Sequence, residues 1–179
     1  VIYKATTPLD GTDSANRGIQ TNLGDIITAA MADSFNEPVD GALVNGGSFR
    51  IDDMLSGNIT SIDIFRVLPF GGNLVKVEMD GRLLIEVLDY GKLNEGTGAY
   101  LQRYNIEEND NGGWSISGKS INTNAVYTIA MSDFLMKGYD IPFLRRDNKG
   151  VISVYEPKPS EAASDIRKAV ILYLKTLNK

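Results

Sequence analysis

Apolar residues follow helical spacing in some segments of this chain and strand spacing in others, and the two kinds of segment alternate irregularly. Polar turns join some strand-like segments without a helix between them, which favours a mixed sheet over a strict succession of parallel βαβ units. Residues 1–16 are polar and rich in turn formers, so they are expected to form an extended lead-in. The predicted helices cover 21–35, 61–67, 82–90 and 160–177, and the predicted strands cover 41–44, 73–79, 100–106 and 126–131, with a hairpin loop at 107–113 and another strand after it.

Two residue types are missing from the chain. Its 179 residues include no Cys and no His, which excludes disulfides, thiolate nucleophiles and His-dependent catalysis. Any catalysis by this chain alone would rest on carboxylates, Lys, Tyr or Ser, or on a hard cation held by oxygen ligands. The length fits one domain of ordinary size.

The charge balance and the hydropathy argue against two kinds of partner. The 18 Lys and Arg residues and 23 Asp and Glu residues give a net charge of −5, which disfavours a general nucleic-acid surface. No apolar run approaches the ~20 residues that a membrane-spanning helix needs. The chain begins with Val and carries no cleavable signal peptide, so we expect a processed or trimmed N-terminus.

Residues 113–120 match the phosphate-binding pattern G-x4-G-K-[ST] literally. That chemistry needs a strand before the loop and a helix after it, so that backbone amides face the phosphates. Here a polar turn comes before the motif and a strand-like segment follows it, while Trp114 to Ser117 alternate like a strand themselves. The sequence therefore favours a hairpin, and a P-loop ATP-binding protein is kept as a minor alternative.

Loops of unusual composition point to a ligand. Asn45 to Arg50 follow a predicted buried strand, and Gly46 and Gly47 allow the backbone to approach a bound molecule closely. Asn45 offers a donor and an acceptor to a base edge, and the Arg50 guanidinium suits a phosphate or a carboxylate. The alternative for this loop is a simple glycine turn with a solvated Arg.

Two aromatic residues lie in the other loops. Phe70 sits among Pro and Gly residues, and Phe134 follows a predicted strand, so the pair could clamp a planar base, although each is also a candidate for the core. Asp140 could accept hydrogen bonds from both hydroxyls of a ribose, or cap a turn. With Arg17 and Arg50 as anion-binding groups, the set has the composition of a nucleotide site.

Five segments in this order resemble the C-terminal domain of the 5'-nucleotidase, UDP-sugar hydrolase and 2',3'-cyclic phosphodiesterase family. The resemblance extends from about Arg17 to the closing helix and implies a single domain of this type over 1–179, with an α+β fold of four α/β/β/α layers and mixed sheets. Gly24, in the first turn of the first helix, is expected to serve close packing or a ligand. The five segments are Gln20–Gly24, Val44–Arg50, Val67–Gly71, Thr97–Gln102 and Asp133–Asp140.

The resemblance implies a role for each matching residue. The two phenyl rings would sandwich the base, Asn45 would meet its edge, Asp140 would bind the ribose hydroxyls, and the two arginines would hold the phosphate. Lys137 and Tyr139 are bulkier than the residues usual in the family, so the sugar pocket is expected to differ. The implied substrate-binding residues are Arg17, Asn45, Gly47, Arg50, Phe70, Gly98, Phe134 and Asp140.

In that family a separate N-terminal domain holds two divalent metal ions, and its ligands include His. This chain has no His, so it resembles the recognition half without the chemical half, and we expect it to bind no cofactor and to hydrolyse nothing alone. The implied partners are a nucleoside or nucleotide such as adenosine or AMP, a UDP-sugar as a further candidate, and a metallophosphatase domain in the same chain or in another subunit. The resemblance also implies a periplasmic, cell-surface or secreted location. A stand-alone nucleoside-binding module is the main alternative.

Overall fold

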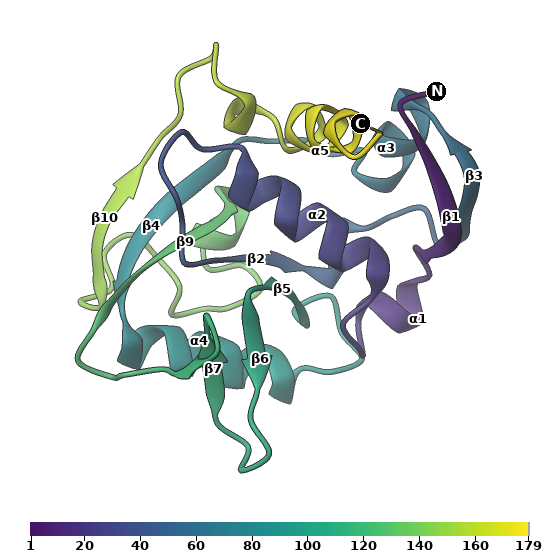
Figure 1. Cartoon of the computed structure of the whole chain (residues 1–179). Helices are drawn as coiled ribbons and strands as arrows, with labels where there is room; N and C mark the ends of the chain where they lie inside the picture. The colour runs from purple at the N-terminus through teal and green to yellow at the C-terminus, as the bar shows by residue number, and fades with distance from the viewer. Residues whose placement is uncertain (179) are drawn as a thin grey trace.

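A five-stranded mixed sheet forms the centre of the molecule in the computed structural model, which describes residues 1–178 (Figure 1). Its strand order is β10-β4-β9-β2-β5, in which β2 and β9 run parallel and the other neighbours run antiparallel. The predicted mixed sheet is therefore confirmed. The five strands are β2 (Gly41–Asn45), β4 (Leu74–Asp80), β5 (Leu101–Tyr104), β9 (Val126–Ser132) and β10 (Val151–Tyr155).

Helices cover both faces of this sheet (Figure 1). The helices α2 (Asn22–Asp33) and α5 (Ile166–Thr176) pack on one face, and α4 (Gly81–Leu93) packs on the other. Alternating side chains of β2 enter the two cores, because successive residues of a strand point to opposite faces. Ala42 and Val44 join the core beneath α2 and α5, whereas Leu43 joins the core beneath α4. The helix α3 (Ser61–Val67) contributes Ile64 and Val67 to the core beneath α2 and α5.

Two smaller sheets flank the central one. The strands β1 (Tyr3–Asp10) and β3 (Met54–Ile59) pair antiparallel, and the short helix α1 (Asp13–Asn16) follows β1. The extended lead-in expected for residues 1–16 thus consists of a strand and one helical turn. The third sheet contains β6 (Ile106–Glu108), β7 (Trp114–Ile116) and β8 (Lys119–Ser120).

A bend at Asn105 divides the strand predicted for 100–106. Asn105 has a φ of +61°, in the left-handed region that an Asn side chain tolerates better than most. Its Nδ2 donates to the carbonyl of Asp40 at 2.9 Å and to Ser117 Oγ at 2.8 Å, which holds the bend in place. The residues before the bend belong to the central sheet and those after it to the third sheet.

The hairpin predicted for residues 113–120 is confirmed. Ile116 pairs with Lys119 across a two-residue turn, whose members Ser117 and Gly118 have φ values of +53° and +76°. Two successive positive φ angles are typical of the tight turns that match the twist of a hairpin. Lys119 lies in strand β8, and no helix begins there, so residues 113–120 do not have the strand–loop–helix arrangement of a P-loop.

The predicted helices form, with revised ends. Thr21 caps α2, since its Oγ1 accepts from the backbone N–H of Gly24 at 2.8 Å. The closing helix begins at Ile166 rather than at residue 160, because Asp165 caps it there and the 3-10 turn η3 (Ala162–Ser164) comes before it. No helix within residues 1–178 is long and apolar enough to cross a membrane.

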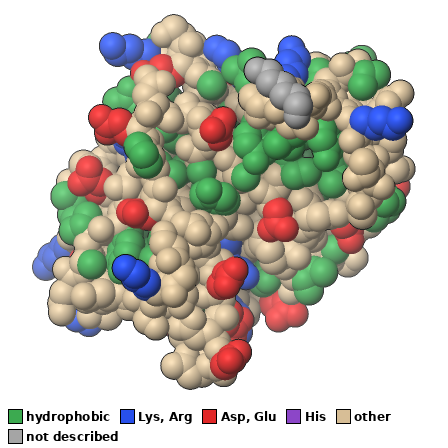
Figure 2. Space-filling view, in the orientation of Figure 1, with side chains coloured by type: hydrophobic (Ala, Val, Ile, Leu, Met, Phe, Trp, Pro, Cys, Tyr) green, Lys and Arg blue, Asp and Glu red, His purple; other side chains and the backbone are tan. Residues whose placement is uncertain are grey.

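The surface facing the viewer in Figure 2 carries no large field of one charge. Acidic and basic side chains are scattered singly over it, and hydrophobic side chains gather in its upper half. This distribution offers no continuous basic band on that face for a polyanion.

A buried amide joins segments that are distant in the sequence. Gln102 is fully buried in β5, where its Oε1 accepts from the backbone N–H of Thr21 at 2.9 Å. Its Nε2 donates to the carbonyls of Asn16 at 3.0 Å and Ile19 at 2.6 Å. A Cβ at Gly24 would lie 1.9 Å from Gln102 Oε1, so Gly24 serves the close packing of this amide.

Replacing Gln102 with Leu is expected to destabilise the fold by about 3 kcal/mol, because two buried backbone groups, and the part-buried carbonyl of Ile19, would lose their partner. Gln20→Leu is the matched control, since Gln20 also bonds to the backbone of β5 but is only half-buried, so that water can replace it. This control should lose less than about 1 kcal/mol. Urea unfolding followed by the fluorescence of the single Trp measures both values. Equal losses in the two variants would contradict the account.

Candidate functional site

A cavity of about 640 Å³ lies at the edge of the central sheet where β2 and β9 end. The segment between α3 and β4 closes it from one side. The carboxyl ends of neighbouring parallel strands are a common place for a ligand site, because the loops that leave them diverge. All eight predicted binding residues line this cavity: Arg17, Asn45, Gly47, Arg50, Phe70, Gly98, Phe134 and Asp140.

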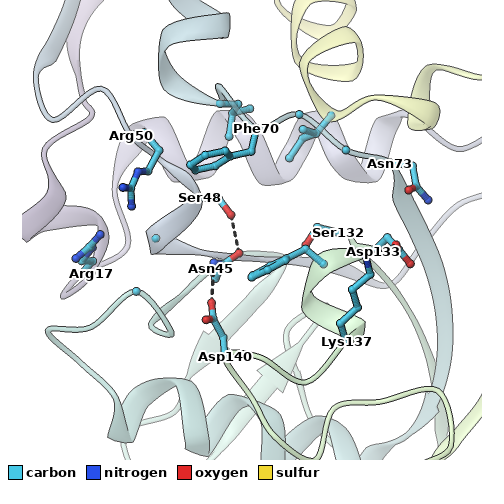
Figure 3. A pocket seen from close by; sticks show the side chains of 17 residues that line it. Arg17, Asn45, Ser48, Arg50, Phe70, Asn73, Ser132, Asp133, Lys137 and Asp140 are labelled. Carbon is cyan, nitrogen blue, oxygen red and sulfur yellow. Dashed lines mark hydrogen bonds and ion pairs between the residues drawn. The ribbon is translucent and has the colours of Figure 1, made fainter.

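The chemistry of the lining changes from one end of the cavity to the other (Figure 3). Arg17 and Arg50 lie at one end, and Asn73, Asp133 and Lys137 lie at the opposite end. The Phe70 ring and the pair formed by Asn45 and Asp140 lie between these ends, and Phe134 also lines the cavity. The cavity therefore presents cationic groups at one end, an aromatic ring and a polar pair in the middle, and mixed polar groups at the other end.

The two arginines reach the cavity from different elements. Arg17 ends the short helix α1, and its backbone carbonyl accepts from the N–H of Gly96 at 2.7 Å. Arg50 follows the loop after β2, and its N–H donates to the carbonyl of Val67 at 2.8 Å. Arg17 Nε is buried without a hydrogen-bond partner within residues 1–178. Since an unpaired buried donor costs ~1–3 kcal/mol, an anion that accepted from it would recover part of that cost.

The aromatic side chains are unusually exposed for their size. Phe70 is 76% exposed and Phe134 is 45% exposed, so neither belongs to the core. The Arg50 guanidinium lies 5.6 Å from the centre of the Phe70 ring. Tyr139 packs against Phe134 with ring centres 5.6 Å apart and planes 31° apart. The rings of Phe70 and Phe134 supply π-faces on which a planar base could stack.

Asn45 and Asp140 form a hydrogen-bonded pair within the cavity (Figure 3). Asn45 Nδ2 donates to Asp140 Oδ2 at 2.8 Å, and Ser48 Oγ donates to Asn45 Oδ1 at 2.7 Å. Burial raises the pKa of the Asp140 carboxyl above its ordinary value, and the hydrogen bond from Asn45 offsets part of that rise. Both polar atoms of Asn45 are thus engaged within the protein, one of them in orienting Asp140.

Two glycines bring the walls of the cavity together. The N–H of Gly47 donates to the carbonyl of Gly98 at 3.0 Å. A Cβ at Gly47 would lie 3.0 Å from Gly98 Cα, so a larger residue there would push the loops apart. Gly98 is predicted from the sequence to bind the substrate, and its backbone forms part of the wall of the cavity.

Further residues complete the lining, several of them at the end away from the arginines. None of them is among the binding residues predicted from the sequence, although the bulk of Lys137 is expected there to alter the sugar pocket. Asp133 there pairs with Arg146 at 2.7 Å and with Lys137 Nζ at 3.7 Å. Within residues 1–178, no three Asp or Glu side chains gather as a metal-binding group. The additional lining residues include Ser48, Asn73, Ser132, Asp133, Lys137 and Ile166.

Comparison with known proteins identifies the family. Residues 1–144 match a family model described as 5'-nucleotidase, C-terminal domain. The chain belongs to this family. It is 31% identical over 149 residues to protein UshA of Escherichia coli and 33% identical over 147 residues to a 5'-nucleotidase of Vibrio cholerae. These alignments cover 79% and 78% of this chain but 26% of each relative, so the chain spans about a quarter of their length.

Solved structures with the same fold come from longer proteins. A 5'-nucleotidase precursor from Thermus thermophilus superimposes with a TM-score of 0.80 at 22% identity, covering 99% of this chain and 36% of that one. The NAD nucleotidase of Haemophilus influenzae superimposes with a TM-score of 0.74 at 21% identity, covering 99% and 35%. At these identities the superpositions show the fold of 5'-nucleotidase C-terminal domains, which confirms the combination of helices with a mixed sheet expected from the sequence.

Replacing Asp140 with Asn is expected to stabilise the protein slightly at pH 7. Because burial raises the pKa of this carboxyl, its charged form costs stability at neutral pH, and the cost disappears as the pH falls through the raised pKa. Asn keeps an acceptor for Asn45, so the gain should vanish near pH 3, below the ordinary Asp pKa of ~3.9.

Urea unfolding at both pH values measures this difference. Asp147→Asn is the control, since Asp147 is well exposed and should give no gain at pH 7. A gain for Asp140→Asn that persists unchanged at pH 3, or no gain at pH 7, would contradict the account.

Proposed function

We propose that this chain is the nucleotide-recognition domain of a 5'-nucleotidase-type phosphoesterase. The observation that carries the proposal is that one cavity brings together cationic groups at one end, a diol-accepting carboxylate and exposed aromatic rings. A nucleoside monophosphate has one part to match each of them, namely the phosphate, the ribose and the base. Family membership and the names of the relatives support a substrate of this class.

Each group has a task that its chemistry suits. Arg17 and Arg50 bind the phosphate by donating charge-assisted hydrogen bonds to its oxygens. Asp140, oriented by Asn45, accepts from the ribose hydroxyls. Phe70 and Phe134 stack on the two faces of the base, and such stacking is worth ~1–3 kcal/mol per base. The domain thereby fixes the orientation of the substrate, which is a large part of what phosphoryl transfer requires.

The hydrolytic chemistry belongs, in this proposal, to a metal-bearing domain in the same chain or in a partner subunit. The residues of this chain do not fit a two-metal centre, because it lacks His and residues 1–178 contain no converging acidic group. We further propose that the protein acts in the periplasm, at the cell surface or outside the cell, as the family resemblance implies. A stand-alone nucleoside-binding module is the second candidate, since residues of this chain alone line a cavity of about 640 Å³.

The isolated chain is expected to bind AMP without hydrolysing it. Phosphate release from AMP with added Mg²⁺ or Mn²⁺ measures this directly. Phosphate release that scales with the concentration of this protein, and that survives removal of trace phosphatase, would contradict the division of labour proposed above.

Calorimetric titration with adenosine and AMP tests the recognition site. Phe70→Ala should weaken the binding of both ligands about 10- to 100-fold, because it removes one stacking face and stacking is worth ~1–3 kcal/mol. Ile152→Ala is the control, since Ile152 is a similarly exposed apolar residue on β10 that does not line the cavity. Failure of both ligands to bind the wild-type chain would overturn the proposal, and equal binding by the Phe70 variant would remove the base clamp from it.

The same titration separates the contribution of the phosphate to the binding affinity from that of the nucleoside. AMP should bind the wild-type chain more tightly than adenosine does, and Arg50→Ala should abolish most of that difference while changing adenosine binding little. Arg82→Ala is the matched control, because Arg82 is exposed on α4 away from the cavity. Loss of the AMP preference in the Arg82 variant as well would indicate a general charge effect rather than a phosphate site.

A further inference from the structure

The first turn of α5 contacts the loop that carries Phe70. The backbone N–H of Ile166 donates to the carbonyl of Gly72 at 2.9 Å, and the side chain of Ile166 lines the cavity while being 4% exposed. The match to the family model ends at residue 144, before α5 begins. The cavity therefore depends on a helix that lies outside the matched region.

Arg167 reinforces this contact. Its guanidinium lies 4.5 Å from the centre of the Phe65 ring, a cation–π arrangement. Asp165 fixes the guanidinium, since Arg167 Nε and Nη2 donate to its two carboxylate oxygens at 3.2 and 3.1 Å. A Cβ at Gly71 would lie 2.6 Å from Arg167 Nη2, which places the guanidinium directly against the backbone of that glycine.

The Phe70 loop needs such a support. Gly71 and Gly72 have φ values of +59° and +101°, and glycines in this region leave the backbone many alternative conformations. The Phe70 ring is itself 76% exposed, so burial of the ring does little to hold it. The contacts from α5 therefore add a restraint on this backbone to those from the Gly71 N–H, which donates to the Leu68 carbonyl at 3.2 Å, and from the Arg50 guanidinium beside the ring.

We propose that Arg167 is a positioning residue of the nucleotide site, which holds Phe70 at the place where it can stack on a base. This inference rests on the proposed function for its ligand, but the positioning itself concerns the free protein. Arg167 orders the loop before the ligand arrives, so that less conformational entropy is lost on binding.

Fluorine NMR of protein labelled with 4-fluorophenylalanine reports on Phe70 without any ligand. The chain has six Phe residues, and the Phe70 signal is assigned by its loss in Phe70→Leu. Arg167→Met should move the Phe70 signal towards that of the unfolded chain and leave the Phe134 signal in place. Arg167→Lys, which keeps the charge but lacks the planar group, should show an intermediate shift. Lys168→Met is the matched control, because Lys168 is exposed on the same turn and should change neither signal.

Calorimetry with adenosine then tests the consequence for binding. Arg167→Met should weaken adenosine binding about tenfold, equivalent to ~1.4 kcal/mol, and Lys168→Met should leave it unchanged. Should Arg167→Met fail to fold, Phe65→Leu removes the ring beneath the guanidinium and should shift the same Phe70 signal. Wild-type affinity or a wild-type Phe70 signal in the folded Arg167 variant would overturn the proposal. If the wild-type chain bound no adenosine, the proposed function would fail while the fluorine signal still decided whether Arg167 positions Phe70.

Discussion

The buried side-chain amide of Gln102 connects β5 to the segment that delivers Arg17 to the cavity. Its hydrogen bonds to Asn16, Ile19 and Thr21 fix the backbone on both sides of that arginine and the start of α2. A buried polar group that is fully paired specifies one arrangement, because any alternative leaves donors and acceptors without partners. The placement of Arg17, and with it the cationic end of the cavity, follows from this network. The other segments that line the cavity then pack around this fixed backbone.

The groups facing the cavity are less well satisfied than those of the core. Arg17 Nε lacks a partner within residues 1–178, burial disfavours the charged form of Asp140, and Phe70 lies largely in solvent. Natural proteins retain such locally unfavourable features chiefly where function requires them. Their concentration around one cavity agrees with a site whose partners arrive with the ligand. Asn45 differs from these groups, because both polar atoms of its side chain already have partners within the protein and one of them orients Asp140.

The sequence predicted the elements whose periodicity is regular, and the exceptions have physical causes. The strand β3 contains Gly57 at a φ of +67°, and α1 is a single turn, so neither shows a clear period. Asn105 divides one predicted strand between two sheets through hydrogen bonds to residues far away in the sequence. The types of the binding residues could be predicted from loop motifs, but their convergence could not, because it depends on how five segments meet. The support that Arg167 gives to the Phe70 loop has no local signature, since it arises only when α5 packs beside that loop.

The central claim is that one cavity receives a nucleotide in a defined orientation, and a crystal structure of this chain with AMP tests that claim most directly. The account predicts the base between Phe70 and Phe134, the ribose hydroxyls within hydrogen-bond distance of Asp140, and the phosphate against Arg17 and Arg50. AMP bound at another surface, or bound in the cavity with its phosphate at the end formed by Asp133 and Lys137, would contradict it.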